Sequence, residues 1–369
     1  MKILITGASG FVGKNLVAEL RNRGYEDLFL YTRENSLENL AQFTKECEFV
    51  FHLAGINRTK NEEEFMEGNF EFTSKLLELL KMHNNKSPVL ITSSIQAEIT
   101  NPYGESKRAG ENLLFKYSKE VGAKVYVYRL PNLFGKWSKP NYNTVVATYC
   151  YNFARNLDIQ INNPEAELTL CYIDDVLEEF VKALEGSPTK LNKYCTIQTT
   201  YSIKLGELAK RIESFNESRG TLSVPNMEDD LTKKLYSTYL SFLPEDKYSY
   251  DLKMNVDNRG SFTEFLRTPD RGQVSVNVSK SGITKGNHWH HTKSEKFLVV
   301  SGEGLIRFRK VHSKEIIEYK VSGEKLQVVD IPVGYTHSIV NTGKSDMVTV
   351  MWVNECFNSE NPDTYHLGV

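Results

Sequence analysis

The glycine-rich stretch Thr6–Gly13, which reads TGASGFVG, indicates the fold most directly. It follows a short apolar run and leads into Val12–Arg23, where apolar residues recur three and four apart as on one face of a helix. Gly7, Gly10 and Gly13 stand at three-residue intervals. Glycines permit a tight turn and let the backbone approach a pyrophosphate, whose charge the helix N-terminus stabilises. The stretch therefore predicts a dinucleotide-binding turn between a first strand and a first helix.

Short apolar runs continue to alternate with helical stretches as far as about residue 175. The predicted strands are Ile3–Thr6, Leu28–Tyr31, Phe49–Leu53, Val89–Thr92 and Val125–Leu130, and further helices are predicted over Phe70–His83 and Tyr103–Val121. This alternation is typical of a parallel sheet covered by helices. We therefore expect an α/β doubly wound, Rossmann-like domain.

The pattern changes beyond residues 244–255, a stretch without clear periodicity that we interpret as a linker. Short alternating segments follow at close spacing, which favours an all-β sandwich or barrel. They are Gln273–Val278, Glu295–Val300, Leu305–Val311, Gln327–Ile331 and Met347–Val353. At 369 residues the chain is long enough for two domains, which we place at 1–245 and 246–369.

Composition is that of an ordinary soluble protein. With 45 basic and 47 acidic side chains, the formal charge of −2 suggests no nucleic-acid or membrane-surface partner. The chain shows neither a signal peptide nor a membrane-spanning run, and its five cysteines form no Cys-x-x-Cys pair. We expect a cytoplasmic protein with reduced thiols.

The residues after the second predicted strand bear on cofactor choice. Sites that prefer NAD usually carry an acidic residue there, which binds the ribose hydroxyls. Here the stretch Leu30–Arg33 reads LYTR, with no acid. Arg33 can pair with the additional phosphate of NADP, so NADPH is the predicted cofactor; the alternative is a solvated surface arginine.

A tyrosine and a lysine stand four residues apart at Tyr103 and Lys107, on one face of a predicted helix. The ordinary pKa of a tyrosine is about 10, and a nearby ammonium lowers it towards the range useful for proton transfer. The pair is common by chance, but its position after the fourth strand, in a chain with the glycine turn, favours a catalytic interpretation.

With these features the sequence resembles the extended short-chain dehydrogenase/reductase family from its start to about residue 185. The resemblance rests further on Phe51–Gly55 (FHLAG), Thr92–Ser94, Arg129–Gly135 and Tyr172–Val176. It implies that hydride passes from the nicotinamide to a carbonyl carbon while Tyr103 protonates the oxygen. The implied cofactor-binding residues are Gly7, Gly10, Phe11, Val12, Gly13, Arg33, Leu53, Ala54, Gly55, Asn69, Tyr103 and Lys107.

The same resemblance implies a serine that holds the substrate carbonyl. Register favours Ser94, with Ser93 as the alternative. The last two family segments occur in members that act on nucleotide sugars. Such members often carry an arginine shortly before the Asp-Asp pair, whereas this chain has Glu167–Cys171 (ELTLC) there. The sequence therefore leaves open which residues bind the nucleotide of the substrate.

Four of the eight histidines fall in two short stretches of the second domain. Residues two apart on a strand point to the same side, so His288 and His290 can face one cavity. Glu295 would join them from the next strand and His337 from across the barrel. Three imidazoles and a carboxylate suit a divalent transition metal such as zinc, with iron, manganese or nickel as alternatives.

The spacing of these residues closely resembles the two motifs of the cupin family, and Asp257–Phe265 is similar to the start of sugar-nucleotide 3,5-epimerases and ketoisomerases, which are also cupins. That resemblance implies an epimerase in which a metal polarises a 4-keto group and stabilises the enolate. The proton-transfer residue stays open; Lys296 and Tyr335 lie close in sequence. The alternative is a barrel that only holds a dimer together.

A reductase followed by a cupin resembles the bifunctional enzymes of bacterial capsular polysaccharide synthesis, which act on the route to N-acetyl-L-fucosamine. The resemblance implies a homodimer that epimerises carbon 3 of a UDP-linked 4-keto-6-deoxy-N-acetylhexosamine and reduces its 4-keto group with NADPH. Two alternatives are an epimerase or dehydratase that retains NAD, and a non-catalytic redox or ligand sensor. The presence of Tyr103 and Lys107 argues against the sensor.

Overall fold

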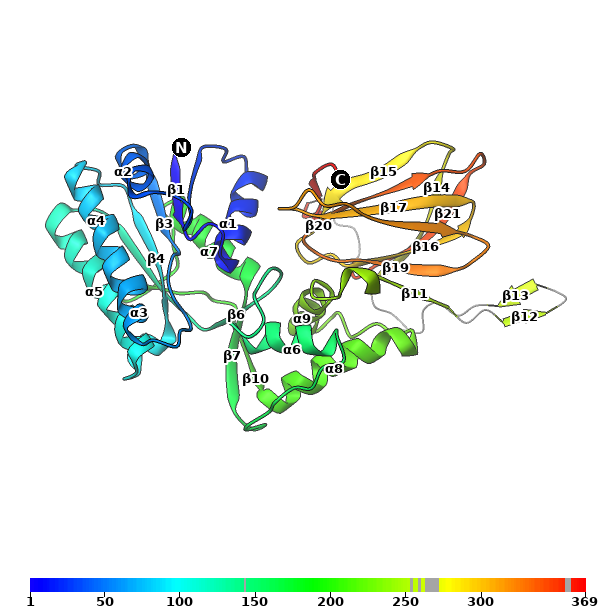
Figure 1. Ribbon diagram of the computed structural model, residues 1–369, viewed down its shortest axis with the longest axis horizontal. Coiled ribbons are helices and arrows are strands. Elements are labelled where there is room, and N and C mark those ends of the chain that lie inside the picture. Colours follow the sequence, from blue (N-terminus) through cyan, green and yellow to red (C-terminus); the bar gives the residue numbers. More distant parts are fainter. Residues whose placement is uncertain (143, 253–254, 258–259, 263–271, 356–359) are drawn as a thin grey trace. The chain divides into compact units, whose positions relative to one another are not determined.

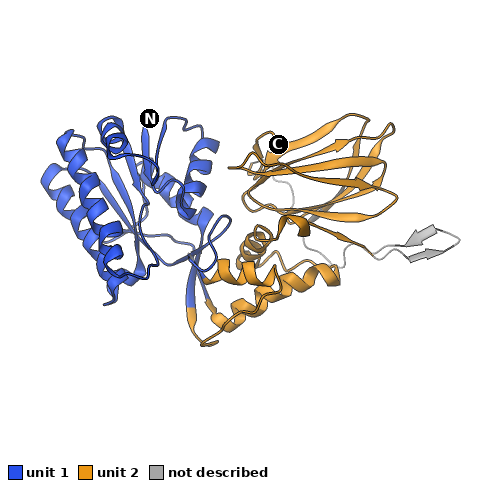
Figure 2. Cartoon of the chain, in the orientation of Figure 1, with its two compact units in different colours: residues 1–144, 168–202 blue, residues 145–167, 203–369 orange. Residues whose placement is uncertain are grey.

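The computed structural model describes residues 1–142, 144–252, 255–257, 260–262, 272–355 and 360–369. The chain forms two compact units, unit 1 from residues 1–144 and 168–202 and unit 2 from residues 145–167 and 203–369 (Figure 2). It therefore passes from one unit to the other three times. Cys356 and most of the predicted motif Asp257–Phe265 lie outside the described residues.

Unit 1 is built on a sheet with the strand order β2-β1-β3-β4-β5-β9-β8 (Figure 1). Neighbouring strands from β2 to β9 are parallel, and β8 is antiparallel to β9. Every residue of β1 and β3 is buried, because helices cover both faces of the sheet. The strands are β1 (Ile3–Thr6), β2 (Leu28–Tyr31), β3 (Phe49–His52), β4 (Val89–Ser94), β5 (Val125–Leu130), β8 (Lys190–Leu191) and β9 (Tyr194–Cys195).

Two groups of helices lie on opposite faces of this sheet (Figure 1). Helix α1 (Phe11–Asn22) packs against α7 (Ile173–Leu184), while α4 (Phe72–Met82) packs against α2 (Leu37–Glu46) and α5 (Pro102–Val121). This arrangement confirms the predicted doubly wound α/β fold. The shorter elements are α3 (Glu63–Met66), a π-helical segment (Glu67–Glu71), a 3₁₀ turn (Ile95–Glu98) and a small sheet of β6 (Asn132–Phe134), β7 (Glu167–Tyr172) and β10 (Tyr201–Lys204).

The strand order reverses direction at β1, which pairs with β2 on one side and β3 on the other. Crossover connections therefore leave β1 and β3 in opposite directions and open a crevice at the carboxyl ends of these strands. Ligands of doubly wound sheets bind at such a point. The glycine turn follows β1 and the Leu53–Gly55 segment follows β3, so both end at this crevice.

Unit 2 contains two five-stranded antiparallel sheets, with the orders β11-β19-β16-β21-β14 and β18-β17-β20-β15-β22. They confirm the predicted all-β fold of this region. The strands are β11 (Ser249–Asp251), β14 (Gln273–Ser279), β15 (Thr284–Trp289), β16 (Glu295–Ser301), β17 (Glu303–Lys310), β18 (Ile317–Ser322), β19 (Gln327–Ile331), β20 (Tyr335–Asn341), β21 (Met347–Val353) and β22 (Tyr365–His366); β12 (Asn255–Asp257) and β13 (Gly260–Phe262) pair separately.

Three helices also belong to unit 2. α6 (Val145–Phe153), α8 (Leu205–Thr221) and α9 (Asp230–Leu240) pack against one another. The stretch predicted as a linker is not one, because β11 pairs with β19 inside the barrel and a 3₁₀ turn (Glu245–Lys247) precedes it. The division of the chain into two domains of separate function at residue 245 remains a prediction.

Candidate functional site

The glycine turn has the geometry that a phosphate-binding turn requires. Gly7 adopts a φ of +70°, and its N–H donates to the carbonyl of Tyr31 at 3.0 Å. A Cβ on Gly13 would lie 2.2 Å from the Gly7 carbonyl oxygen, so no larger residue fits there. Gly10 caps α1 without a side-chain hydrogen bond, and the first turn carries no acidic residue. The N-terminus of α1 thus offers N–H groups and a positive dipole end to an anion.

The segment after β3 packs directly against this turn. A Cβ on Gly7 would lie 2.7 Å from the backbone nitrogen of Ala54, whose N–H donates to the hydroxyl of Thr6 at 3.3 Å. A Cβ on Gly55 would lie 2.6 Å from Oδ1 of Asn69 and 3.0 Å from Nζ of Lys107. The structure therefore brings the predicted cofactor-binding residues of the glycine turn, the β3 end and α5 into one region.

Asn69 fixes that region from the π-helical segment. Its Oδ1 accepts from the N–H of Ile56 at 3.0 Å, and its Nδ2 donates to the Ile56 carbonyl and to Oγ of Ser106, both at 3.0 Å. The side chain is buried, so all three hydrogen bonds are shielded from water. π-helical turns occur frequently at functional sites, where they reposition a single side chain.

The two serines at the end of β4 point to different partners. Ser93 is buried and donates to Oε1 of Glu111 at 2.5 Å, and the same carboxylate is held by the guanidinium of Arg129. Ser94 instead accepts from the N–H of Gln96 at 3.2 Å, and its hydroxyl lies close enough to Tyr103 to lower the pKa of that phenol. The geometry therefore favours Ser94, of the two residues left open by the sequence, as the hydroxyl beside the tyrosine.

Tyr103 stands in the first turn of α5, which begins with the capping residue Asn101 and Pro102. Its hydroxyl also donates to Oδ1 of Asn57 at 3.2 Å. Burial raises the pKa of Tyr103 to about 12, and the neighbouring Ser94 hydroxyl offsets part of this increase. The direction is opposite to the one expected from a nearby ammonium, because desolvation of the phenolate outweighs the other effects.

Lys107 lies one helical turn further along α5. Its Nζ donates to the Thr92 carbonyl at 3.2 Å and lies 5.9 Å from the centre of the Tyr103 ring. Burial lowers the pKa of Lys107 to about 8, an effect that the charge of Glu111 opposes. The ammonium is thus placed between the tyrosine and the Gly55–Asn69 contact, where the resemblance puts the nicotinamide ribose.

Arg33 is exposed in the turn after β2 and makes no hydrogen bond or ion pair with another described residue. Its strand is tied to the glycine turn, because the Tyr31 carbonyl accepts from the N–H groups of both Gly7 and Ala8. The guanidinium is therefore available to bind a negatively charged group beside the glycine turn.

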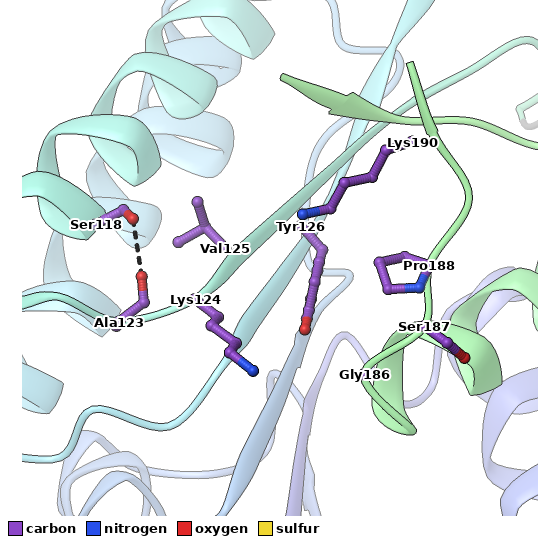
Figure 3. Close-up of a pocket in the computed structure, with 9 residues that line it drawn as sticks. All are labelled: Ser118, Ala123, Lys124, Val125, Tyr126, Gly186, Ser187, Pro188 and Lys190. Carbon is purple, nitrogen blue, oxygen red and sulfur yellow. Dashed lines mark hydrogen bonds between the residues drawn. The ribbon is translucent and has the colours of Figure 1, made fainter. Parts of the chain in front are cut away.

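A separate pocket in unit 1 lies at the amino end of β5 (Figure 3). Because β4 and β5 are parallel, this end is the sheet edge opposite to the one that carries Ser94. Ligands of doubly wound sheets bind at the carboxyl ends of the strands. The pocket is therefore not part of the candidate active site; it is lined by Ser118, Ala123, Lys124, Val125, Tyr126, Gly186, Ser187, Pro188 and Lys190.

The four predicted metal ligands converge in unit 2. Donor atoms of His288, His290, Glu295 and His337 all lie within 4.8 Å of one another. Nε2 of His290 lies 3.4 Å and Nε2 of His337 lies 3.1 Å from Oε2 of Glu295. His288 and His337 are register partners on β15 and β20, beside an irregularity at Asn287, while Glu295 begins β16.

The chemistry of this group fits a divalent transition metal. Nε2 of His290, both ring nitrogens of His337 and Oε2 of Glu295 are buried without a hydrogen-bond partner among the described residues. Buried polar atoms are rarely left in this state unless a ligand satisfies them. Burial lowers the pKa of His288 to about 4, which keeps its imidazole neutral and able to coordinate at neutral pH.

The two residues considered for proton transfer have other partners. Lys296 is buried and its Nζ donates to Oδ1 of Asp330 at 2.6 Å, on the face of β16 opposite to Glu295. Burial opposes its charge, but Asp330 raises the pKa of Lys296 well above its usual value. Tyr335 accepts from the hydroxyl of Tyr248 at 2.5 Å and lies on the same face of β20 as His337.

Some residues of these sites escaped the sequence reasoning. The Ser93–Glu111–Arg129 network and the buried His52, which bridges the hydroxyls of Thr6 and Thr73 at 2.8 Å each, support the reductase site. Asp363 contacts the metal group from the far end of the chain. No local pattern marks such contacts, since the partners stand 18 to 73 residues apart.

None of the described helices is both long enough and apolar enough to cross a bilayer.

Comparison with known proteins matches both parts of the chain to families. Residues 3–193 match the NAD dependent epimerase/dehydratase family, and residues 255–365 match the polysaccharide biosynthesis C-terminal domain. A relative from Pseudomonas aeruginosa, UDP-2-acetamido-2,6-beta-L-arabino-hexul-4-ose reductase, is 48% identical and aligned over 100% of this chain and 99% of its own.

Two solved structures are similar to different extents. The capsular polysaccharide assembling protein CapF from Staphylococcus aureus is 55% identical, covers 100% of both chains and has a TM-score of 0.69. The UDP-glucose 4-epimerase of Thermotoga maritima is 23% identical, covers 58% of this chain and 82% of its own, and has a TM-score of 0.52. The second likeness concerns the fold alone.

Proposed function

The chain belongs to the NAD dependent epimerase/dehydratase family, and from this premise we propose that it is a bifunctional UDP-sugar enzyme of capsular polysaccharide precursor synthesis. Its substrate is a UDP-linked 4-keto-6-deoxy-N-acetylhexosamine. Unit 2 epimerises carbon 3, and unit 1 then reduces the 4-keto group. The observation that carries the proposal is the presence, in one chain, of the Ser94–Tyr103–Lys107 arrangement and the His₃Glu group.

In the reductase, NADPH bound along the glycine turn supplies the hydride. Ser94 and Tyr103 hold the carbonyl oxygen between their hydroxyls, and Tyr103 donates its proton as the carbon accepts hydride. Its pKa of about 12 keeps the phenol protonated at neutral pH, as a proton donor must be. Lys107 binds the ribose and stabilises the phenolate left after the transfer.

Arg33 supports NADPH over NADH in this proposal. It is exposed, lacks partners among the described residues and follows the strand whose last carbonyl is tied to the glycine turn. A guanidinium in that position matches the charge and geometry of a phosphate. An acidic residue, which sites that prefer NAD usually carry there, is absent from Leu30–Arg33.

In the epimerase, His288, His290, Glu295 and His337 hold one divalent metal, with zinc the best match to three imidazoles and a carboxylate. Such an ion polarises a carbonyl oxygen as a Lewis acid and makes the proton on the neighbouring carbon more acidic. The unpartnered donor atoms of His290, Glu295 and His337 support a resident ion. Lys296 lies on the face of β16 opposite to Glu295, whereas Tyr335 shares the face of β20 with His337, so Tyr335 is the better candidate for proton transfer.

We also propose a cytoplasmic homodimer. Strand β14 lies at the edge of its sheet, and Val274, Val276 and Val278 on one face of it are each more than half exposed. A stripe of exposed valines on an edge strand invites pairing with another chain unless it is covered. A second copy of the chain would cover it.

The first experiment is NADPH oxidation with a UDP-linked 4-keto-6-deoxy-N-acetylhexosamine, run on wild type and His290→Ala and followed by product analysis. Oxidation in wild type, with an unepimerised or missing product in the variant, supports two coupled sites. If no keto sugar nucleotide supports oxidation, the reductase is refuted and the sensor alternative gains support. Turnover without net NADPH consumption would instead favour an epimerase or dehydratase that retains NAD.

A further inference from the structure

The last residues of the chain lie across the metal group. Strand β22 (Tyr365–His366) pairs with β15, and His366 is the register partner of the predicted ligand His288. Beyond it, the N–H of Leu367 donates to the carbonyl of Asn287 at 2.9 Å, and the Leu367 carbonyl accepts from the Thr336 hydroxyl. These contacts reach the residues adjacent to two of the ligands, on two different strands.

Asp363 fixes the loop between the other two ligands. Its carboxylate accepts from the backbone N–H groups of His291, Thr292 and Lys293 at 2.9, 2.9 and 2.8 Å. It also accepts from the Thr292 hydroxyl at 3.1 Å. This loop joins His290 to Glu295 and contains four residues, so one carboxylate satisfies most of its backbone donors. Hydrogen bonds to an ionised carboxylate are about twice as strong as neutral ones.

The backbone carbonyl of Asp363 determines which ring nitrogen of His290 carries a proton. Its carbonyl lies 2.5 Å from Nδ1 of His290. Because a carbonyl only accepts, Nδ1 carries the proton, and the neutral imidazole then presents its lone pair on Nε2. Nε2 is the atom that faces Oε2 of Glu295, at 3.4 Å. Asp363 holds this carbonyl in place with a φ of +39°, a backbone conformation that aspartate tolerates better than most residues.

We propose that the C-terminal segment Asp363–Leu367 is part of the metal centre, with Asp363 as a positioning residue that fixes the tautomer and orientation of His290 and the loop leading to Glu295. The inference rests on the proposed metal site and deepens it. Partners of this kind typically contribute 10- to 100-fold to metal affinity. None of the residues from Asp363 to Leu367 needs to touch the ion for this effect.

The alternative is that the C-terminal segment acts as a clamp: it stabilises the barrel but does not affect metal affinity or the geometry of the ligands. The two roles differ in what a substitution changes. Loss of a clamp lowers the stability of the metal-free protein and leaves the geometry of the ligands intact. Loss of the Asp363 carboxylate frees the segment that carries the Asp363 carbonyl, so His290 can rotate or change tautomer, which weakens metal binding and alters the spectrum of the bound ion.

The test compares the full-length wild type with Asp363→Ala, Asp363→Asn and the control Asp346→Ala. Asp346 is an exposed aspartate of the same barrel, in the turn between β20 and β21. Zn²⁺ affinity is measured by competition with a chromophoric chelator, and the visible spectrum of the Co²⁺-substituted protein reports ligand geometry. The thermal midpoint of the metal-free protein measures stability separately. Asp363→Asn keeps one acceptor oxygen and serves as the milder variant if Asp363→Ala does not fold.

We expect Asp363→Ala to weaken Zn²⁺ binding about 10- to 100-fold and to shift the Co²⁺ spectrum. Asp363→Asn should fall between it and wild type, and Asp346→Ala should match wild type. Wild-type affinity and spectrum in both Asp363 variants would overturn the inference, whatever happens to the thermal midpoint. A wild-type protein that binds neither ion would refute the metal centre itself, and the positioning role with it.

Discussion

Replacing Ser94 by alanine tests the proposed reductase most directly. The Ser94 hydroxyl lies beside Tyr103, and in the proposed reaction both hydroxyls contact the carbonyl oxygen. Removing one preorganised donor from an oxyanion-stabilising pair typically lowers kcat by about 100- to 1000-fold, which corresponds to about 2.7–4 kcal/mol. Ser94 also lowers the pKa of Tyr103. Ser94→Ala should therefore raise that pKa. In the reverse reaction, alcohol oxidation, the rate increases with pH as Tyr103 is deprotonated, and this increase should move to higher pH.

Ser93→Ala is the matched control, because it removes the same atom one residue away. Ser93 donates to Glu111 at 2.5 Å, and that carboxylate keeps its two hydrogen bonds to Arg129 after the substitution. A hydrogen bond to a charged group contributes about 1.5–3 kcal/mol to stability. Ser93→Ala should therefore lower the thermal midpoint while kcat changes by only a few-fold.

The assay is steady-state NADPH oxidation for both variants, with cofactor binding measured by fluorescence and unfolding followed by circular dichroism. The reasoning predicts a large loss of kcat and unchanged NADPH affinity for Ser94→Ala, and loss of stability with retained kcat for Ser93→Ala. The reverse pattern would identify Ser93 as the substrate-binding hydroxyl. Wild-type kcat in Ser94→Ala would remove this residue from the reaction.

The remaining predictions concern four other positions. Tyr103→Phe should abolish reduction and leave NADPH binding nearly intact, and turnover in this variant would exclude Tyr103 as proton donor. Arg33→Ala should shift the ratio of kcat/KM values towards NADH; an unchanged ratio would show that Arg33 does not bind the cofactor. Asp330→Asn leaves the Lys296 ammonium buried without its counter-charge and should destabilise unit 2 by about 3–5 kcal/mol in urea unfolding, whereas an unchanged midpoint would contradict the buried pair. Burial and the charge of Lys107 lower the pKa of His52 to about 3, so the folded state binds fewer protons than the unfolded state between pH values of about 6.5 and 3. Stability should fall as pH drops through that window, and His52→Gln should flatten this part of the curve; an equally steep curve would show that other groups govern it.

Local patterns predicted the sheet of unit 1 and most of the barrel well. The strands Ile3–Thr6, Leu28–Tyr31 and Val125–Leu130 have the predicted bounds, because glycine turns and apolar runs are signals carried by neighbouring residues. The donor atoms of the four predicted metal ligands also come together, within 4.8 Å of one another.

The features that the sequence did not predict correctly, or left open, depend on contacts between residues far apart in the chain. The stretch 244–255 reads as a linker because β11 within it has only three residues and depends on pairing with β19. The choice between Ser93 and Ser94 stayed open in the sequence, because only the position of Glu111 shows which hydroxyl is already engaged. The pKa of Tyr103 moved against expectation because burial, which a sequence does not reveal, outweighs a nearby charge.

The three passages of the chain between the units have a consequence for biosynthesis. Helix α6 leaves the ribosome early, but its apolar side chains Val146, Ala147, Tyr149 and Cys150 are buried partly by α8 and α9, which begin about 50 and 80 residues later. Because translation adds about 5–20 residues per second, several seconds pass between the synthesis of α6 and that of α8 and α9. During that interval the apolar face of α6 is not yet covered. Chaperone binding to nascent chains should therefore peak between the synthesis of α6 and that of α9.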